Sequence, residues 1–188
     1  MPILGIMASS VLKSTTSFES IQTVTVGTAT STMTFTSIPA TYTHLQIRGM
    51  LNGTASGTFG NARMGFNSNS GANYSSHNMY GYASATGAQS EVSGNRMYYQ
   101  VYTSLASTSS YVGVTVIDIL DYANTNKYKT LRSLGGQDLN SSSPTGEIYF
   151  GSNLWLSTTA ISSLVIVPRT GTNFVQYTQF ALYGIKGA

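Results

Sequence analysis

The sequence has no cysteine, and charged residues make up only 8% of it, against roughly 25% in an ordinary globular protein. Without cysteine the fold needs neither disulfide bonds nor a thiolate metal site, which fits assembly in a reducing cytoplasm or a particle that needs no oxidation. The nine lysines and arginines are scattered, whereas a nucleic-acid-binding surface would need them clustered. We therefore expect no nucleic-acid partner, and a surface covered mainly by Ser, Thr, Asn, Gly and Tyr.

Histidine is scarce as well, which limits acid–base and nucleophilic catalysis. His44 alternates outward on a predicted strand, and His77 lies beside Ser76 without the Gly-x-Ser-x-Gly elbow of a hydrolase. Asp118 and Asp121 are three residues apart on an extended segment, so their side chains point to opposite faces and do not form the carboxylate pair of a glycosidase. The sequence predicts no catalytic site, no cofactor and no enzymatic activity.

Apolar runs long enough to span a membrane are also missing. The start of the chain, residues 1–7, is apolar but lacks the basic start and long apolar region of a signal peptide. We interpret residues 1–17 as a docking arm and linker that contacts a neighbouring subunit or particle; the alternative is a frayed terminus. The arm's apolar side chains are Ile3, Leu4, Ile6, Met7, Val11 and Leu12.

From residue 18 onward, apolar and polar residues alternate with a period of two between Gly, Asn and Pro turns, which is typical of strands. Residues 67–82 look irregular and residues 83–94 look like an exposed loop. With no convincing helix, the pattern predicts an all-β domain over residues 18–188. We expect a jelly-roll-like antiparallel sandwich of about 8–10 strands, preceded by the short N-terminal arm.

The longest apolar run lies within residues 111–136, where a polar turn and a returning strand follow it. This pattern predicts a hairpin at the centre of the sandwich. Val112, Val114 and Val116 point to one side of the extended chain, and Ile117 and Ile119 to the other. A strand that is apolar on both faces must be covered on both faces, so we place it in the middle of a core.

Asp118 interrupts this apolar strand, and a buried carboxylate needs a partner. We expect it to form an ion pair with Lys129 or Arg132 of the following strand, or with a cation of a neighbour. In the turn, oxygen atoms of Asp121, Asn124 and Asn126, with Asp118, are candidate calcium ligands. Asx residues that cap a hairpin turn explain the same pattern more simply, so no metal site is predicted.

Tyrosine is abundant, with thirteen residues in the chain. Exposed tyrosines among Asn and Ser suit stacking on sugars or contact with proteins; the alternative is ordinary half-buried strand aromatics. The candidate recognition residues are Tyr74, His77, Tyr80 and Tyr82.

Six segments taken together resemble a family of small virion proteins from tailed phages, which are frequent in marine and freshwater phages. The resemblance covers nearly the whole chain and is weakest at residues 54–60, 83–94 and 104–110. The segments are MPILGIMASS, SFESIQTVTVG, FTSIPATYTHLQIRG, FNSNSGANYSSH, VIDILDYANTNKYKTLRSLGG and FALYGIKG.

The resemblance implies a structural protein of the virion surface, assembled in the host cytoplasm. We expect a capsid decoration (cement) protein that binds the major capsid protein and stabilises its lattice, with the N-terminal arm as an anchor. Decoration proteins of this kind usually occupy three-fold positions of the capsid, so by analogy the expected assembly is a homotrimer. The alternative is a tail-fibre or receptor-binding module that recognises host surface glycans through the tyrosine-rich loops. Neither alternative involves a membrane partner.

Overall fold

The computed structural model describes residues 17–55, 60–82, 84–105, 112–138, 146–169 and 171–187, with the backbone alone for residues 98–105. Every regular element in these ranges is a strand, so the all-β prediction is confirmed. The described ranges contain no helix long and apolar enough to cross a membrane. The arm residues Ile3, Leu4, Ile6, Met7, Val11 and Leu12 lie outside them, so their docking role stays a prediction.

The described chain has twelve strands, more than the sequence predicted. The surplus comes mainly from residues 67–94, where segments expected to be irregular form a hairpin. The strands are β1 (Phe18–Thr25), β2 (Met33–Phe35), β3 (His44–Gly53), β4 (Gly60–Phe66), β5 (Tyr74–Tyr82), β6 (Ala85–Gly94), β7 (Met97–Leu105), β8 (Gly113–Leu120), β9 (Lys129–Gln137), β10 (Glu147–Trp155), β11 (Leu164–Pro168) and β12 (Gln179–Ile185).

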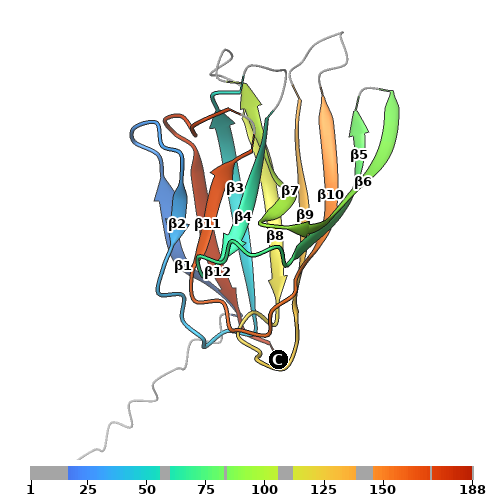
Figure 1. Ribbon diagram of the computed structural model, residues 1–188. Helices are drawn as coiled ribbons and strands as arrows, with labels where there is room; N and C mark the ends of the chain where they lie inside the picture. Colours follow the sequence, from blue (N-terminus) through green and yellow to red (C-terminus); the bar gives the residue numbers. More distant parts are fainter. Residues whose placement is uncertain are drawn as a thin grey trace, which may run out of the picture.

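The strand order is that of a jelly roll with two hairpins added. One layer has the order β1-β12-β3-β8, and the other has the order β2-β11-β4-β7, with antiparallel neighbours throughout (Figure 1). These eight strands form the two Greek keys of a jelly-roll sandwich, as the sequence predicted. A short parallel pairing of β3 with β7 joins the two layers at one end.

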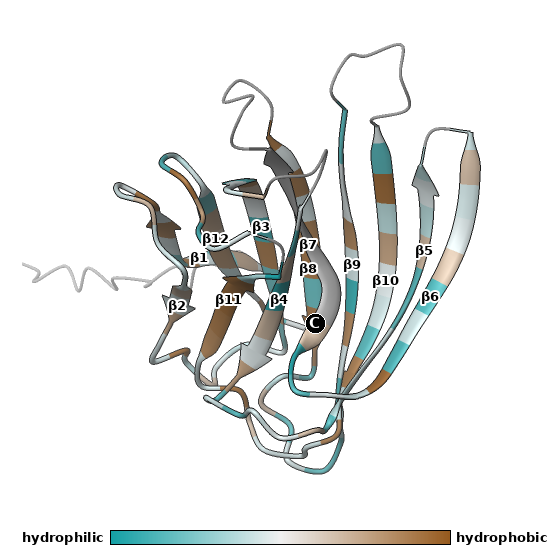
Figure 2. Ribbon diagram, turned by 45° about the horizontal axis from the view of Figure 1, so that its top comes forward, coloured by the Kyte–Doolittle hydropathy of each residue, from teal (hydrophilic) through white to brown (hydrophobic). Residues whose placement is uncertain are grey.

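The added hairpins both extend the first layer. β5 and β6 follow β4 in the chain, β9 and β10 follow β8, and together they continue the sheet as β8-β9-β10-β5-β6. We call β9, β10, β5 and β6 the extension. Figure 2 shows its outer strands reaching well to one side of β2 and β11. The first sheet is therefore wider than the second sheet that packs against it.

The hydrophobic core lies between the layers, because each strand turns alternate residues inward. The predicted hairpin of residues 111–136 is present as β8 and β9, with β8 near the middle of the first sheet. Fully buried core residues include Leu45, Ile47, Ile117, Ile119 and Leu182 of the first sheet, and Phe35, Met64, Phe66 and Ile166 of the second.

Aromatic rings close one end of this core. The Trp155 ring centroid lies 5.4 Å from that of Phe66 and 6.0 Å from that of Tyr74, on which it stacks. The Tyr74 hydroxyl accepts a hydrogen bond from the Phe66 backbone N–H at 3.0 Å. Tyr74 thus anchors the connection between β4 and the extension to the core.

Candidate functional site: a docking face

The outer face of the first sheet, turned away from the second sheet, carries apolar side chains that no other described element covers. On β8, Ile117 and Ile119 are fully buried, whereas Val114 and Val116 are 51% and 38% exposed. The prediction that both faces of this strand are covered is therefore wrong for the described chain. The second sheet packs on one face of β8 only, and the valines face outward.

Cross-strand pairing continues this apolar surface over three more strands. Met79 is 67% exposed, Ile148 57% and Phe150 50%. We call the resulting surface the docking face. It consists of two adjacent rows across β8, β9, β10 and β5: Val116, Leu134, Phe150 and Met79 in one, and Val114, Gly136, Ile148 and Gly81 in the other.

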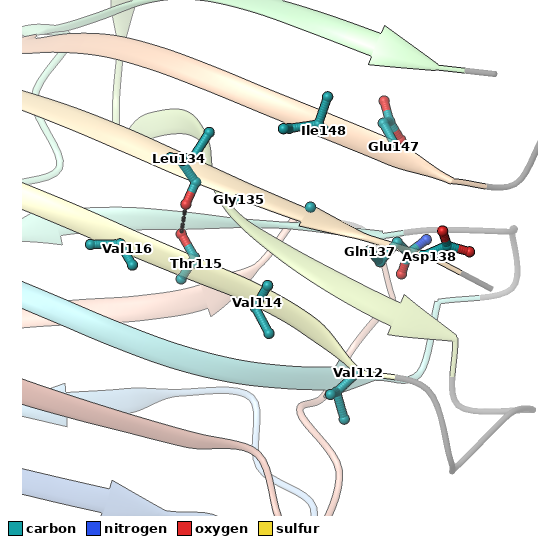
Figure 3. Close-up of a pocket in the computed structure, with 11 residues that line it drawn as sticks. Val112, Val114, Thr115, Val116, Leu134, Gly135, Gln137, Asp138, Glu147 and Ile148 are labelled. Carbon is teal, nitrogen blue, oxygen red and sulfur yellow. Dashed lines mark hydrogen bonds between the residues drawn. The ribbon is translucent and has the colours of Figure 1, made fainter. Parts of the chain in front are cut away.

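Glycines on the docking face leave grooves beside its bulky side chains. Ile148 stands between Gly136 and Gly81 in the second row, so a bulky side chain alternates with positions that have none. A groove of about 470 Å³ includes Val114, Leu134 and Gly136 in its wall, and Figure 3 shows its lining side chains on three neighbouring strands. A second groove, of about 490 Å³, lies on the Gly81 side. Leu134 and Ile148 line both grooves and form a ridge between them.

Polar and charged side chains border the docking face. Arg48 lies opposite Val116, with its guanidinium carbon 5.2 Å and 5.5 Å from the ring centroids of Phe18 and Tyr183. Its Nε donates a hydrogen bond to Gln46 Oε1 at 2.9 Å. An apolar centre with a polar rim is the usual anatomy of a protein interface.

Asp118 forms no ion pair with Lys129 or Arg132 within the described structure, so that part of the prediction is wrong, while pairing with a cation of a neighbour stays a prediction. Asp118 shares the outer face of β8 with the two valines and is partly exposed. Its Oδ1 accepts a hydrogen bond from Gln46 Nε2 at 2.8 Å. Arg132 lies opposite on β9, yet the ion pairs recorded for the described residues involve other side chains. A carboxylate at the solvent-facing surface needs no cation, because water and an amide already satisfy it.

Lys129, the other expected partner, faces the interior and is fully buried. Its ammonium donates hydrogen bonds to the carbonyl oxygens of Asn124, Lys127 (2.8 Å) and Thr158 (3.0 Å). Burial lowers the pKa of Lys129, and the negative charge of Asp121 offsets part of that effect. Three acceptors match the three donors of an ammonium, so Lys129 fastens the turn after β8 to the segment after β10.

The turn itself confirms the interpretation of residues 121–126 as Asx turn chemistry. Asn124 Oδ1 accepts the backbone N–H of Asn126 at 2.8 Å. The Asp121 carboxylate accepts a hydrogen bond from Lys127 Nζ at 2.9 Å, which lowers the pKa of Asp121. His44, predicted at the surface, is partly exposed, and its Nδ1 accepts the Asp121 backbone N–H at 3.0 Å. Within the described ranges no three His, Cys, Asp or Glu side chains gather as metal ligands would.

The four candidate recognition residues do not share one surface. Tyr74 is fully buried in the core, so its prediction as a surface residue is wrong. Tyr80 and Tyr82 are half-buried on the inner face of β5, and His77 is exposed on the outer face. Tyr80 packs beside Tyr149, with ring centroids 5.5 Å apart. Successive side chains of a strand point to opposite faces of the sheet. His77 therefore lies on the other face of β5 from Tyr80 and Tyr82.

No family model, curated protein or solved structure matches this chain. Function is therefore inferred from the fold and from the docking face. The sequence reasoning missed the residues of this face on β9, β10 and β5. A signal was present in β10, where Ile148 and Phe150 alternate with the buried Tyr149 and Gly151, so that this strand has apolar residues on both faces.

Proposed function

We propose that this chain is a non-enzymatic structural protein of a phage virion, and specifically a capsid decoration protein that stabilises the major capsid lattice. The observation that carries the proposal is the docking face. Contiguous exposed apolar patches larger than a few hundred Å² mark interaction sites, and the six partly exposed apolar side chains of this face support a protein that works within an assembly. Jelly-roll sandwiches occur among viral capsid proteins and lectins. The resemblance to tailed-phage virion proteins favours a role in the virus particle over a role as a lectin.

The physical role follows from where such a protein would sit. A sandwich that bridges neighbouring capsid subunits adds buried apolar area across their seams, and this area resists the outward pressure of packaged DNA. The apolar arm of residues 1–12 supplies a contact with the major capsid protein, and the sandwich supplies the bridging body. A sparsely charged surface lets many copies lie close together without mutual repulsion.

The test is to locate and count the protein on purified virions of the phage that encodes it. We expect copies on the capsid in numbers comparable with the major capsid protein, seen by quantitative mass spectrometry and electron microscopy. Absence from the virion overturns the proposal. Capsids prepared without the protein are then incubated with the full chain or with a chain lacking residues 1–12. Equal occupancy by the two chains rules out the arm as the anchor.

The second candidate is a tail-fibre or receptor-binding module for host glycans, and one observation favours it. A groove of about 260 Å³ on β5, β6 and β10 is lined by His77, Phe150 and Ser152, among others. An aromatic ring beside hydrogen-bonding side chains suits a sugar. A glycan array that shows binding, lost in His77→Ala and retained in the inner-face variant Tyr80→Ala, would support it. A small number of copies of the protein per virion, all located on the tail, would also support the receptor-binding function.

A further inference from the structure

We propose that the docking face binds the same face of a second copy of this chain about a two-fold axis, so that the protein pairs with itself. The inference rests on the assembly role proposed above and names the partner of the face. Its support comes from the shape, the area and the charge of the surface.

The shape of the docking face is complementary to itself. The ridge of Leu134 and Ile148 separates two grooves of nearly equal volume, about 470 Å³ and 490 Å³. Gly136 and Gly81 keep the two grooves open beside Ile148. When two such faces meet about a two-fold axis, the ridge of each copy enters a groove of the other. This is the arrangement of an isologous interface, in which one patch supplies both halves of the contact.

A stable pair needs a broad apolar centre, and the docking face offers one. Exposed apolar patches larger than a few hundred Å² mark protein–protein interaction sites, and the two rows present six large apolar side chains on four strands. A standard interface buries about 800 Å² on each partner. Six side chains of the two rows, together with Val112 and Met50 beside them, are 38–67% exposed: Val112, Val114, Val116, Leu134, Ile148, Phe150, Met79 and Met50.

The charge distribution permits two identical faces to meet. Neither row of the docking face contains a charged residue, and the two acidic residues that line the first groove, Asp138 and Glu147, belong to neither row. The centre of the contact therefore has no like charges in opposition. The border carries both signs, with Arg48 and Arg132 along one side and Asp118 beside them. A nucleic acid would need a cluster of positive charge at the centre instead. The apolar centre therefore favours a protein partner with the same character.

The experiment measures the mass of the full chain by light scattering and sedimentation at micromolar concentration. We expect a dimer for the wild type. Phe150→Ser, and separately Ile148→Thr, should weaken pairing at least tenfold, because each removes an apolar anchor from the centre of the contact. The matched control is Tyr177→Ser, which alters an aromatic residue that is 77% exposed and does not line the docking face; it should remain a dimer. Circular dichroism verifies that each variant is folded.

Each other outcome overturns the pairing. These outcomes are a monomeric wild type, a trimer, or a dimer that both face variants leave intact. A full chain that is monomeric while a chain lacking residues 1–12 is dimeric would identify the arm, and not a second copy, as the occupant. A monomer found on capsids would overturn the pairing and leave the proposed function standing, whereas a dimer absent from virions would do the reverse.

Discussion

Lys129 places a charged group where water has little access, and its three carbonyl partners explain how the fold tolerates it. Replacing it by methionine keeps an unbranched apolar stem of similar shape and leaves those carbonyls without their donor. We expect Lys129→Met to lower the free energy of unfolding by about 1–3 kcal/mol, the cost of buried polar groups left unsatisfied. Chemical denaturation measures this change.

Lys127→Met is the matched control. It removes an exposed lysine from the same turn and breaks only the surface ion pair with Asp121, so we expect a loss of about 0–1 kcal/mol. An equal decrease in the free energy of unfolding in the two variants would show that the hydrogen bonds of the buried Lys129 ammonium add no stability beyond that of a surface ion pair.

The buried tyrosines predict how stability depends on alkaline pH. Burial raises the pKa of Tyr74 and of Tyr122 above the ordinary value of 10.0. Above that value the unfolded chain loses the phenol proton while the folded chain keeps it. The stabilising contribution is therefore fully present below about pH 10 and is lost as pH rises through the folded-state pKa values.

Tyr74→Phe isolates one of these contributions. We expect denaturation midpoints of the variant to fall less steeply above pH 10 than those of the wild type. At neutral pH the variant should be less stable by about 1 kcal/mol, because the Phe66 backbone N–H loses the Tyr74 hydroxyl as its acceptor. Parallel slopes above pH 10 would contradict the assignment.

At the scale of the strand, the close approach of β12 to the loop before β3 depends on a residue without a side chain. A Cβ added at Gly184 would collide with the ring of Tyr42, and the Tyr42 hydroxyl donates a hydrogen bond to Glu19 Oε2 at 3.0 Å. The ring therefore has little freedom to move. We expect Gly184→Ala to destabilise the protein by about 1–3 kcal/mol, as overpacking does, measured by thermal denaturation.

Gly27→Ala is the control for that substitution. A Cβ at Gly27 meets nothing within 4 Å, so its melting temperature should stay close to that of the wild type. A Gly184→Ala variant as stable as Gly27→Ala would show that Tyr42 moves aside freely.

Alternation along the strands allowed their existence to be predicted from the sequence, but not what covers each face. In β8 the pattern identified correctly that the valines and isoleucines lie on opposite sides. Which side is covered depends on the position of the second sheet, which strands distant in sequence build. β5 and β6 were missed because Ser, Asn and Gly have low strand propensity, and pairing with β10 overrides that preference. Asp118 was expected to be buried because its strand was expected to be covered twice.

At the scale of the whole molecule, the scarcity of charge predicts an association that salt does not weaken. Raising the salt concentration from about 0.05 M to about 0.5 M screens surface charges, yet the docking face has none in its two rows. We expect the dissociation constant of the dimer to change less than about threefold, since salt does not weaken apolar burial. Sedimentation at several salt concentrations measures it. A tenfold weakening would show that the charged border holds the copies together.

The whole fold was easier to predict than the candidate site. Composition and turn spacing indicated a jelly-roll sandwich, because most of the strands carry that signal locally. The docking face depends on Val114, Leu134, Ile148 and Met79, which come from four strands and meet only through their register. Local periodicity contains no information about such long-range neighbours, so the sequence pointed instead to the arm and the tyrosine-rich segments.

Because β1 pairs with β12, the first strand of the chain finds its neighbour only when synthesis is nearly finished. Phe18 lies opposite Ile185, and β12 stands between β1 and β3. At about 5–20 residues per second, a ribosome leaves β1 without its neighbour for on the order of ten seconds. A nascent chain that stops before β12 exposes the edges of both β1 and β3, and such open edges template aggregation. Premature termination near the end of this chain is therefore expected to yield insoluble protein rather than a trimmed sandwich.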